Sequence, residues 1–93
     1  MQNYPNPFNP VTIIQYEISD PTSKATGLPV EINVYDIRGR FVRTLIKDEK
    51  SPGVYRVRFN GRDEKGLEIP SGVYLYRIRT PDFTDTRKMI LME

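Results

Sequence analysis

The chain has 93 residues, a formal net charge of +2, and no cysteine, histidine or tryptophan. A chain of this length forms one small domain with a modest core and no deep active-site cavity. The missing cysteine and histidine exclude a disulfide framework, a thiolate metal site and the most common general base. Hydrophobic residues are 38% and charged residues 28%, which is typical of a folded domain. No apolar run approaches the ~20 residues that a membrane helix needs.

Near its start the chain carries NYPNPFNP, residues 3–10, which has three asparagines and three prolines and in which asparagine directly precedes proline twice. A residue before proline avoids the helical region, and an asparagine side chain can accept a hydrogen bond from a backbone N–H two residues on. We therefore expect residues 1–10 to form an ordered lead-in segment to a domain over residues 11–93. We expect Phe8 to be well buried and Tyr4 less so.

Strict alternation of apolar and polar residues follows, and it predicts β-strands. The tail TRKMILME is apolar on both faces near its end, as in a strand that is covered on both sides. The stretch FVRTLIKD fits a helical turn as well as a strand, and we interpret it as a strand. The expected inward residues are Ile14, Tyr16 and Ile18; Val30, Ile32 and Val34; Tyr55, Val57 and Phe59; and Tyr74, Tyr76 and Ile78.

Turn signals separate these stretches at short intervals. Arg38-Gly39 predicts a tight hairpin in which Gly39 supplies a positive φ. SPGVYRV, from Ser51, resembles PSGVYLY, from Pro70, and we interpret the two as strands that start from similar turns. About seven short strands with frequent turns indicate an all-β fold, a sandwich of two antiparallel sheets.

The residues offer little for catalysis or metal binding. No serine stands in a G-x-S-x-G turn, and the pairs Asp48-Glu49 and Asp63-Glu64 fall in predicted loops, where charge keeps a surface solvated. We therefore expect no enzymatic activity. Four side chains that carry oxygen surround Gly61 and Gly66 and suggest calcium, although their spacing differs from the known calcium loop. These four are Asn60, Asp63, Glu64 and Glu68.

Two kinds of binding remain as weaker alternatives. Seven basic residues between residues 38 and 58 could bind a single-stranded nucleic acid, although alternating arginines on a strand usually form a solvated face. A small sandwich with exposed tyrosines could bind carbohydrate, although the lack of tryptophan and the expected burial of several tyrosines argue against it. The tyrosines in question are Tyr4, Tyr35, Tyr55, Tyr74 and Tyr76.

Several stretches together resemble one known family. NYPNPFNPVTIIQYEI at residues 3–18, VYDIRGRFVRTL at 34–45, NGRDEKGLEIPSGVYLYRIRT at 60–80 and RKMILM at 87–92 resemble the type A C-terminal sorting domains of cargo of the bacterial type IX secretion system. The middle and closing stretches also resemble the immunoglobulin-like domain of flagellar hook-capping proteins. The resemblance implies an Ig-like antiparallel β-sandwich of about seven strands.

The resemblance also implies a function without catalysis. Such a domain ends a larger secreted enzyme or adhesin and crosses the outer membrane with this cargo. The partners expected are the upstream cargo domain, the outer-membrane translocon and a sortase-like peptidase, with no cofactor, nucleic acid or small-molecule substrate. The expected location is secreted or at the bacterial cell surface, by way of the periplasm. The alternatives are a passive Ig-like spacer or assembly module and, further off, a carbohydrate-binding module.

The family's motifs fall on identifiable residues. Asn60 departs from the usual aromatic-Asp pair before Gly61, and the loop at residues 19–29 is longer than in the shortest members. The last strand, with Lys88, Met89, Ile90 and Leu91, is our hypothesis for the feature that the translocon recognises by strand addition. The motif residues are Asn6, Pro7, Phe8, Asn9, Asp36, Gly39, Arg40, Gly61, Gly66, Gly72 and Tyr74.

Overall fold

The computed structural model describes residues 2–4, 11–19, 27–81 and 83–92, with the backbone alone at residues 2–4. The predictions for Phe8, for the side chain of Tyr4 and for the motif residues Asn6, Pro7 and Asn9 lie outside the described part. Every regular element in that part is a strand, as the alternation predicts. The strands are β1 (Gln2–Tyr4), β2 (Thr12–Ile18), β3 (Leu28–Asp36), β4 (Phe41–Lys50), β5 (Gly53–Phe59), β6 (Gly72–Arg79) and β7 (Thr84–Leu91).

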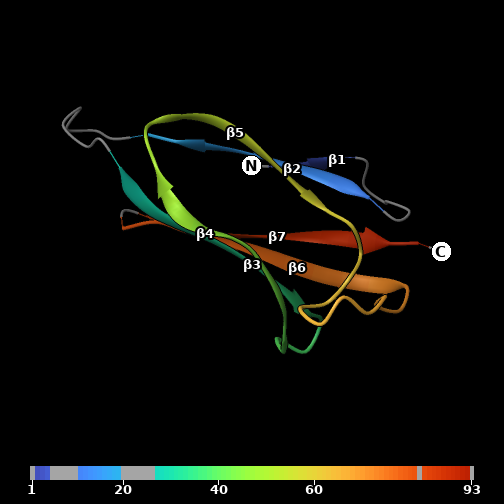
Figure 1. Cartoon of the computed structure of the whole chain (residues 1–93). Coiled ribbons are helices and arrows are strands. Elements are labelled where there is room, and N and C mark those ends of the chain that lie inside the picture. The colour runs from blue at the N-terminus through green and yellow to red at the C-terminus, as the bar shows by residue number, and fades with distance from the viewer. Residues whose placement is uncertain (1, 5–10, 20–26, 82, 93) are drawn as a thin grey trace.

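The strands form two antiparallel sheets that pack face to face (Figure 1). One sheet has the order β1-β2-β5 and the other the order β4-β3-β6-β7. The all-β sandwich is therefore confirmed. Strand β1 was not predicted. It lies within the proposed lead-in segment, and its backbone pairs with β2. The division of the chain at residue 10 stays a prediction. Among the described residues there is no helix with the length and apolarity that crossing a bilayer requires.

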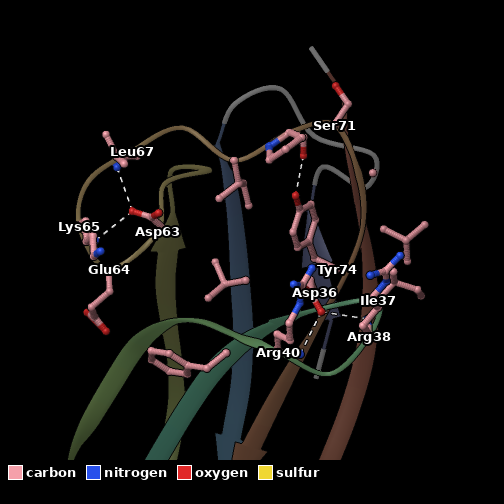
Figure 2. Close-up of a pocket in the computed structure, with 16 residues that line it drawn as sticks. Asp36, Ile37, Arg38, Arg40, Asp63, Glu64, Lys65, Leu67, Ser71 and Tyr74 are labelled. Atoms are coloured by element: carbon pink, nitrogen blue, oxygen red, sulfur yellow. Dashed lines mark hydrogen bonds and ion pairs between the residues drawn. The ribbon is translucent and has the colours of Figure 1, made fainter.

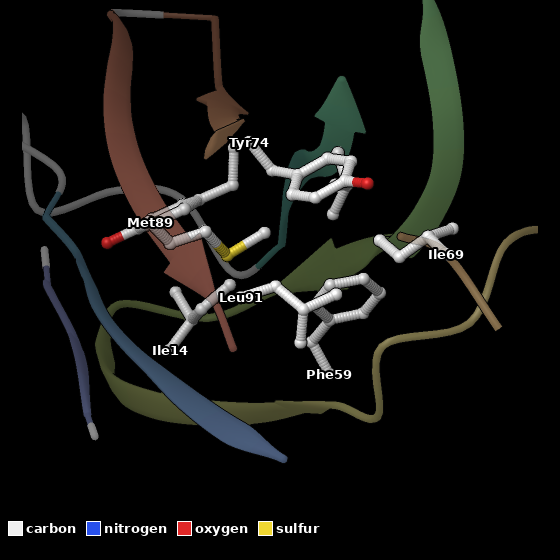
Figure 3. Packing of buried hydrophobic residues seen from close by; sticks show 8 residues of the cluster. Ile14, Phe59, Ile69, Tyr74, Met89 and Leu91 are labelled. Carbon is white, nitrogen blue, oxygen red and sulfur yellow. The ribbon is translucent and has the colours of Figure 1, made fainter. Parts of the chain in front are cut away.

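The core consists of the apolar faces of both sheets, in two adjoining clusters. Leu45 and Val57 pack against both clusters and connect them. All twelve inward residues predicted from the alternation lie in or against these clusters. The first cluster, most of it labelled in Figure 3, contains Ile14, Val34, Phe59, Ile69, Tyr74, Tyr76, Met89 and Leu91. The second contains Tyr16, Ile18, Val30, Ile32 and Ile78.

Strand β4 is a strand, as we interpreted it, and its irregular pattern has a structural cause. The register between β3 and β4 shifts twice, and the β4 residues left without a partner at these shifts are Val42 and Leu45. A bulge of this kind places an extra residue in one strand and turns side chains to the other face. Both extra residues pack against the core. The spacing that resembles a helical turn therefore comes from two bulges.

The expectation of a last strand covered on both faces is wrong. Strand β7 is the outer strand of its sheet and pairs only with β6 in the part of the chain that the structure describes. Met89 and Leu91 face the core, whereas Ile90 and Met92 keep 37% and 50% of their surface exposed. The apolar residues of the tail thus divide between the core and the solvent-exposed surface.

Candidate functional site

The hairpin between β3 and β4 is organised by the side chain of Asp36 (Figure 2). Its Oδ1 accepts hydrogen bonds of 2.9 Å from the backbone N–H groups of Arg38 and Arg40, and its Oδ2 accepts one of 2.9 Å from Arg40 Nε. Gly39 has φ +85° and donates its N–H to the Asp36 carbonyl, which confirms the predicted tight hairpin. The backbone N–H of Arg40 is the main reason that the pKa of Asp36 lies below its usual value.

The loop between β5 and β6 is organised in the same way by Asp63. Its Oδ1 accepts hydrogen bonds from the backbone N–H groups of Lys65 and Leu67, at 2.9 and 3.0 Å. The Gly66 N–H donates to the Asp63 carbonyl, and Gly66 has φ +85°, a conformation that glycine adopts without strain. An aspartate that bonds backbone donors two and four residues on fixes a loop locally.

The oxygens that suggested calcium already accept hydrogen bonds from the chain. Asn60 Oδ1 accepts from Arg43 Nη1 and from the Arg62 N–H, at 3.0 and 3.2 Å. Glu64 Oε2 accepts from the backbone N–H of Thr44 at 3.2 Å. In the ranges that the structure describes, no three acidic side chains gather as a metal site would require. The loop geometry is therefore explained without an ion.

Glu64 also covers part of the outer edge of β4. Its own N–H donates to the Val42 carbonyl at 3.1 Å, next to the bond that its side chain accepts from Thr44. These bonds satisfy backbone groups that an edge strand would otherwise expose. The loop thus protects one edge of the four-stranded sheet, and β7 forms the other edge.

The two similar stretches of sequence build the same local contact. The Tyr74 hydroxyl donates to the Pro70 carbonyl at 2.6 Å, and the Tyr55 hydroxyl donates to the Ser51 carbonyl at 2.5 Å. In each case the acceptor lies four residues before the tyrosine and the strand begins between them. A tyrosine that ties a strand to the chain before it is a known feature of Ig-like sandwiches.

The motif residues that the structure describes gather at one end of the sandwich. The hairpin with Asp36, Gly39 and Arg40 lies beside the loop between β5 and β6 (Figure 1). Between them is an open hollow of about 870 Å³, lined also by Gly72 and Tyr74. Sequence reasoning assigned the hairpin residues and Gly72 to turns and Tyr74 to a strand, and it did not predict the hollow, because these residues come from separate stretches of the chain.

Exposed apolar side chains line this hollow. Ile37, Phe41 and Leu67 keep 63%, 52% and 62% of their surface exposed. Val73 also lines the hollow and lies opposite Ile90 of β7 in the sheet. The hollow therefore approaches the exposed side of the last strand.

The four residues of the translocon hypothesis fall on two faces of β7. Met89 and Leu91 belong to the core and contact its other members (Figure 3). Lys88 and Ile90 point outward and are exposed. Of the four side chains in the hypothesis, only Lys88 and Ile90 are accessible to a partner.

The structure gives little support to the two weaker alternatives, carbohydrate binding and nucleic-acid binding. Tyr74 and Tyr76 are buried, Tyr55 stacks on Tyr16 with ring centroids 5.6 Å apart, and the Arg77 guanidinium lies 4.9 Å above the ring of Tyr35. These aromatic faces are therefore occupied and do not form a platform for a sugar. The basic residues 38–58 lie on β4, on β5 in the opposite sheet and on a hairpin, so they do not all lie on the face of one sheet.

The sequence identifies the family. Residues 13–81, most of the chain, match the FlgD Ig-like domain. The chain belongs to this family. Its sandwich is accordingly Ig-like, in agreement with the strand pattern and with the order of its two sheets.

Solved structures share the fold at low identity. Over 98% of its length, at 22% identity and a TM-score of 0.77, the chain is similar to part of dimeric latent PorU from Porphyromonas gingivalis. Over 99%, at 18% identity and a TM-score of 0.67, it is similar to part of PorZ from the same organism, which is described as an essential surface component of the type IX secretion system. The chain spans 9% and 11% of these two proteins. No curated protein matches the chain.

Proposed function

We propose that the chain is a non-enzymatic C-terminal sorting and anchoring domain, which directs an attached cargo protein through the bacterial type IX secretion system. The observation that carries the proposal is the likeness over nearly the whole chain to a domain of PorZ, a surface component of that system. The sorting-domain motifs support it. Asp36, Gly39 and Arg40 build the hairpin, and Tyr74 ties β6 to the loop before it.

In this proposal the partners are the upstream cargo domain, the outer-membrane translocon and a sortase-like peptidase. The location is secreted or at the cell surface, reached through the periplasm. Recognition rests on surfaces and strand edges. Of the four residues in the hypothesis, Lys88 and Ile90 have exposed side chains, and β7 is the outer strand of its sheet, a position that can receive a partner strand by β-augmentation.

The decisive experiment fuses residues 1–93 to the end of a reporter that carries a signal peptide. We expect export of the reporter from a type IX-competent bacterium and its retention in the periplasm of the same strain without the translocon. Retention in both strains would contradict the sorting function. A reporter of equal size that lacks the sorting domain measures leakage.

The role of the last strand needs a finer comparison. Removal of residues 88–93 tests whether the tail is needed at all, and equal export would contradict the tail hypothesis. This deletion also removes Met89 and Leu91 from the core, so a loss of export could come from unfolding. The double variant Lys88→Glu, Ile90→Ser changes only the outward face. Its matched control on β5 of the other sheet is Arg58→Glu, Val54→Ser, because both of those residues are exposed.

The FlgD Ig-like match favours one second candidate, a passive spacer or assembly module. The position of the domain in the parent gene separates the two functions. A sorting domain of this type stands last in its protein, whereas a spacer can be followed by other domains. The full reading frame, examined for a signal peptide at its start and a stop codon after this domain, makes the distinction.

A further inference from the structure

A second surface, the hollow at the loop end of the sandwich, is separate from the last strand's edge. We define the loop-end hollow by Ile37 and Arg38 on the hairpin, Lys65 and Leu67 on the facing loop, and Phe41 at the start of β4. Figure 2 shows the hairpin residues on one side and the loop residues on the other. Each wall therefore offers one large apolar side chain and one cation that is not paired with Asp36, as Arg40 is.

The apolar side chains of the hollow are not isolated surface residues. Ile37, Phe41 and Leu67 are among the most exposed large apolar side chains of the described chain, and all three line this hollow. Single exposed apolar residues are ordinary, whereas a group of them around a concavity marks a binding surface. An apolar group from a partner would be covered here on several sides.

The walls are also pre-formed. Asp36 holds the hairpin through two backbone N–H groups and Arg40 Nε, and Asp63 holds the loop through two backbone N–H groups. Glu64 fastens the loop to β4 through bonds to Val42 and Thr44. A surface that is already ordered loses little conformational entropy when it binds.

The charges of the hollow differ in what they can still bind. Its three carboxylates, Asp36, Asp63 and Glu64, each accept hydrogen bonds from donors of the chain itself. The side chains of Arg38 and Lys65 make no hydrogen bond or ion pair with any residue that the structure describes, and both are exposed. The charged groups left for a ligand are therefore mainly donors, and a carboxylate is the group that complements them.

From this arrangement we propose that the loop-end hollow binds a segment of a partner protein in which acidic residues flank an aromatic or branched apolar residue. The apolar residue sits among Ile37, Phe41 and Leu67. Its acidic neighbours pair with Arg38 on one wall and Lys65 on the other. A membrane surface fits less well, because three cations among three acids do not form the basic cluster that anionic lipids attract.

The test selects ligands for the folded chain from a library of random peptides. Peptides of about ten residues suffice, since such a segment spans about 33 Å when extended. We expect the selected peptides to be enriched in Asp or Glu next to Phe, Tyr, Leu or Ile. We expect amide NMR shifts on binding at Ile37, Arg38, Lys65 and Leu67. Enrichment of basic peptides, or no enrichment at all, overturns the proposal.

Matched variants locate the site. Arg38→Glu with Lys65→Glu should weaken binding of a selected peptide by tenfold or more, a fold-change of about 1.4 kcal/mol. The control Arg56→Glu with Arg58→Glu makes the same charge change on exposed residues of the other sheet and should leave affinity unchanged. Ile37→Ser should weaken binding, whereas Val54→Ser, at a residue of similar exposure, should not.

Two outcomes contradict the assignment. Equal weakening by both charge-reversal pairs means a general electrostatic effect, and binding to vesicles of anionic lipid without binding to the selected peptide means a membrane surface. Far-UV circular dichroism and the Tm of each variant establish that it is folded. These measurements use the chain alone. A negative binding result therefore does not contradict the export function, and a negative export result does not contradict peptide binding.

Discussion

The hydroxyl of Tyr74 donates a hydrogen bond of 2.6 Å to the carbonyl oxygen of Pro70 across the turn that begins β6. Tyr74 is 7% exposed and its ring contacts the core, so the bond joins the loop around the hollow to the interior. We expect Tyr74→Phe to lower the free energy of unfolding by about 0.5–1.5 kcal/mol, the usual net value of one hydrogen bond. Urea unfolding of the wild type and of the variant measures this difference in free energy.

The equivalent bond from Tyr55 to Ser51 provides the comparison. This bond is exposed to solvent, so water can replace the lost partner. Tyr55→Phe should therefore cost less than Tyr74→Phe. An equal or larger loss for Tyr55→Phe would show that burial does not determine the value of this contact.

Asp36 should make the stability of the domain depend on pH in the acidic range. Hydrogen bonds from the backbone N–H of Arg40, and then from its side chain and from Arg38, hold the pKa of Asp36 below its usual value. The folded chain thus favours the ionised form, and this contribution is present above about pH 4, the ordinary range of an aspartate, and is lost as pH falls through the lowered pKa. The Tm difference between the wild type and Asp36→Asn should shrink as pH falls below about 4.

A second variant tests the cause of this shift. Arg40→Gln removes the guanidinium but keeps the backbone N–H that contributes most to the lowered pKa. Arg40→Gln should therefore retain most of the pH dependence of Tm that Asp36→Asn loses. Loss of the whole effect in Arg40→Gln would assign it to the ion pair between Arg40 and Asp36 instead.

Tyr76 should act at the opposite end of the pH scale. Burial raises its pKa to about 12, above the ordinary value of 10. The folded chain therefore holds the proton more tightly than the unfolded chain. The stability from this group is complete below about pH 10 and is lost as pH rises toward 12. The Tm of Tyr76→Phe, taken relative to its Tm at neutral pH, should therefore fall less between about pH 10 and 12 than the Tm of the wild type does.

Burial also raises the pKa of Tyr16, with smaller contributions from Tyr55 and Asp48. Tyr16→Phe should therefore remove a further part of the alkaline dependence, and the double variant with Tyr76→Phe should show the flattest profile. An unchanged profile in the double variant would mean that other groups cause alkaline unfolding.

Period-two alternation predicted most of the fold, because each sheet has one buried face and its strands place alternate side chains there. It failed where the strand geometry itself changes. In β4 two bulges turn Val42 and Leu45 inward, and no local sequence rule marks their positions. In β1 the three residues that pair with β2 carry no alternation long enough to detect.

The candidate site was predictable only in its parts. The turn-forming roles of Asp36 and Gly39 follow from local chemistry, since a short acidic side chain and a positive φ are what a tight hairpin uses. The hollow depends on the approach of residues 36–41 to residues 63–73, which is a property of the sheet topology. The repeated turn before tyrosine was visible in the sequence, but the bond to the carbonyl four residues earlier required the structure.

The two faces of β7 give the last prediction, which separates folding from recognition at the tail. Met89 is fully buried in the first core cluster, whereas Ile90, its neighbour, is 37% exposed. Met89→Ala should cost about 2–5 kcal/mol of unfolding free energy through lost burial and the cavity left behind. Ile90→Ser should cost about 0.5 kcal/mol, the usual scale of a surface change.

Export of the reporter fusion then distinguishes the two roles of the strand. If the outward face is recognised, Ile90→Ser with Lys88→Glu lowers export while its Tm stays close to that of the wild type. If the strand matters only for folding, export follows Tm across all variants: Met89→Ala lowers both, and the outward variant lowers neither. The second pattern would contradict recognition through the side chains of β7 and leave its backbone edge as the remaining contact.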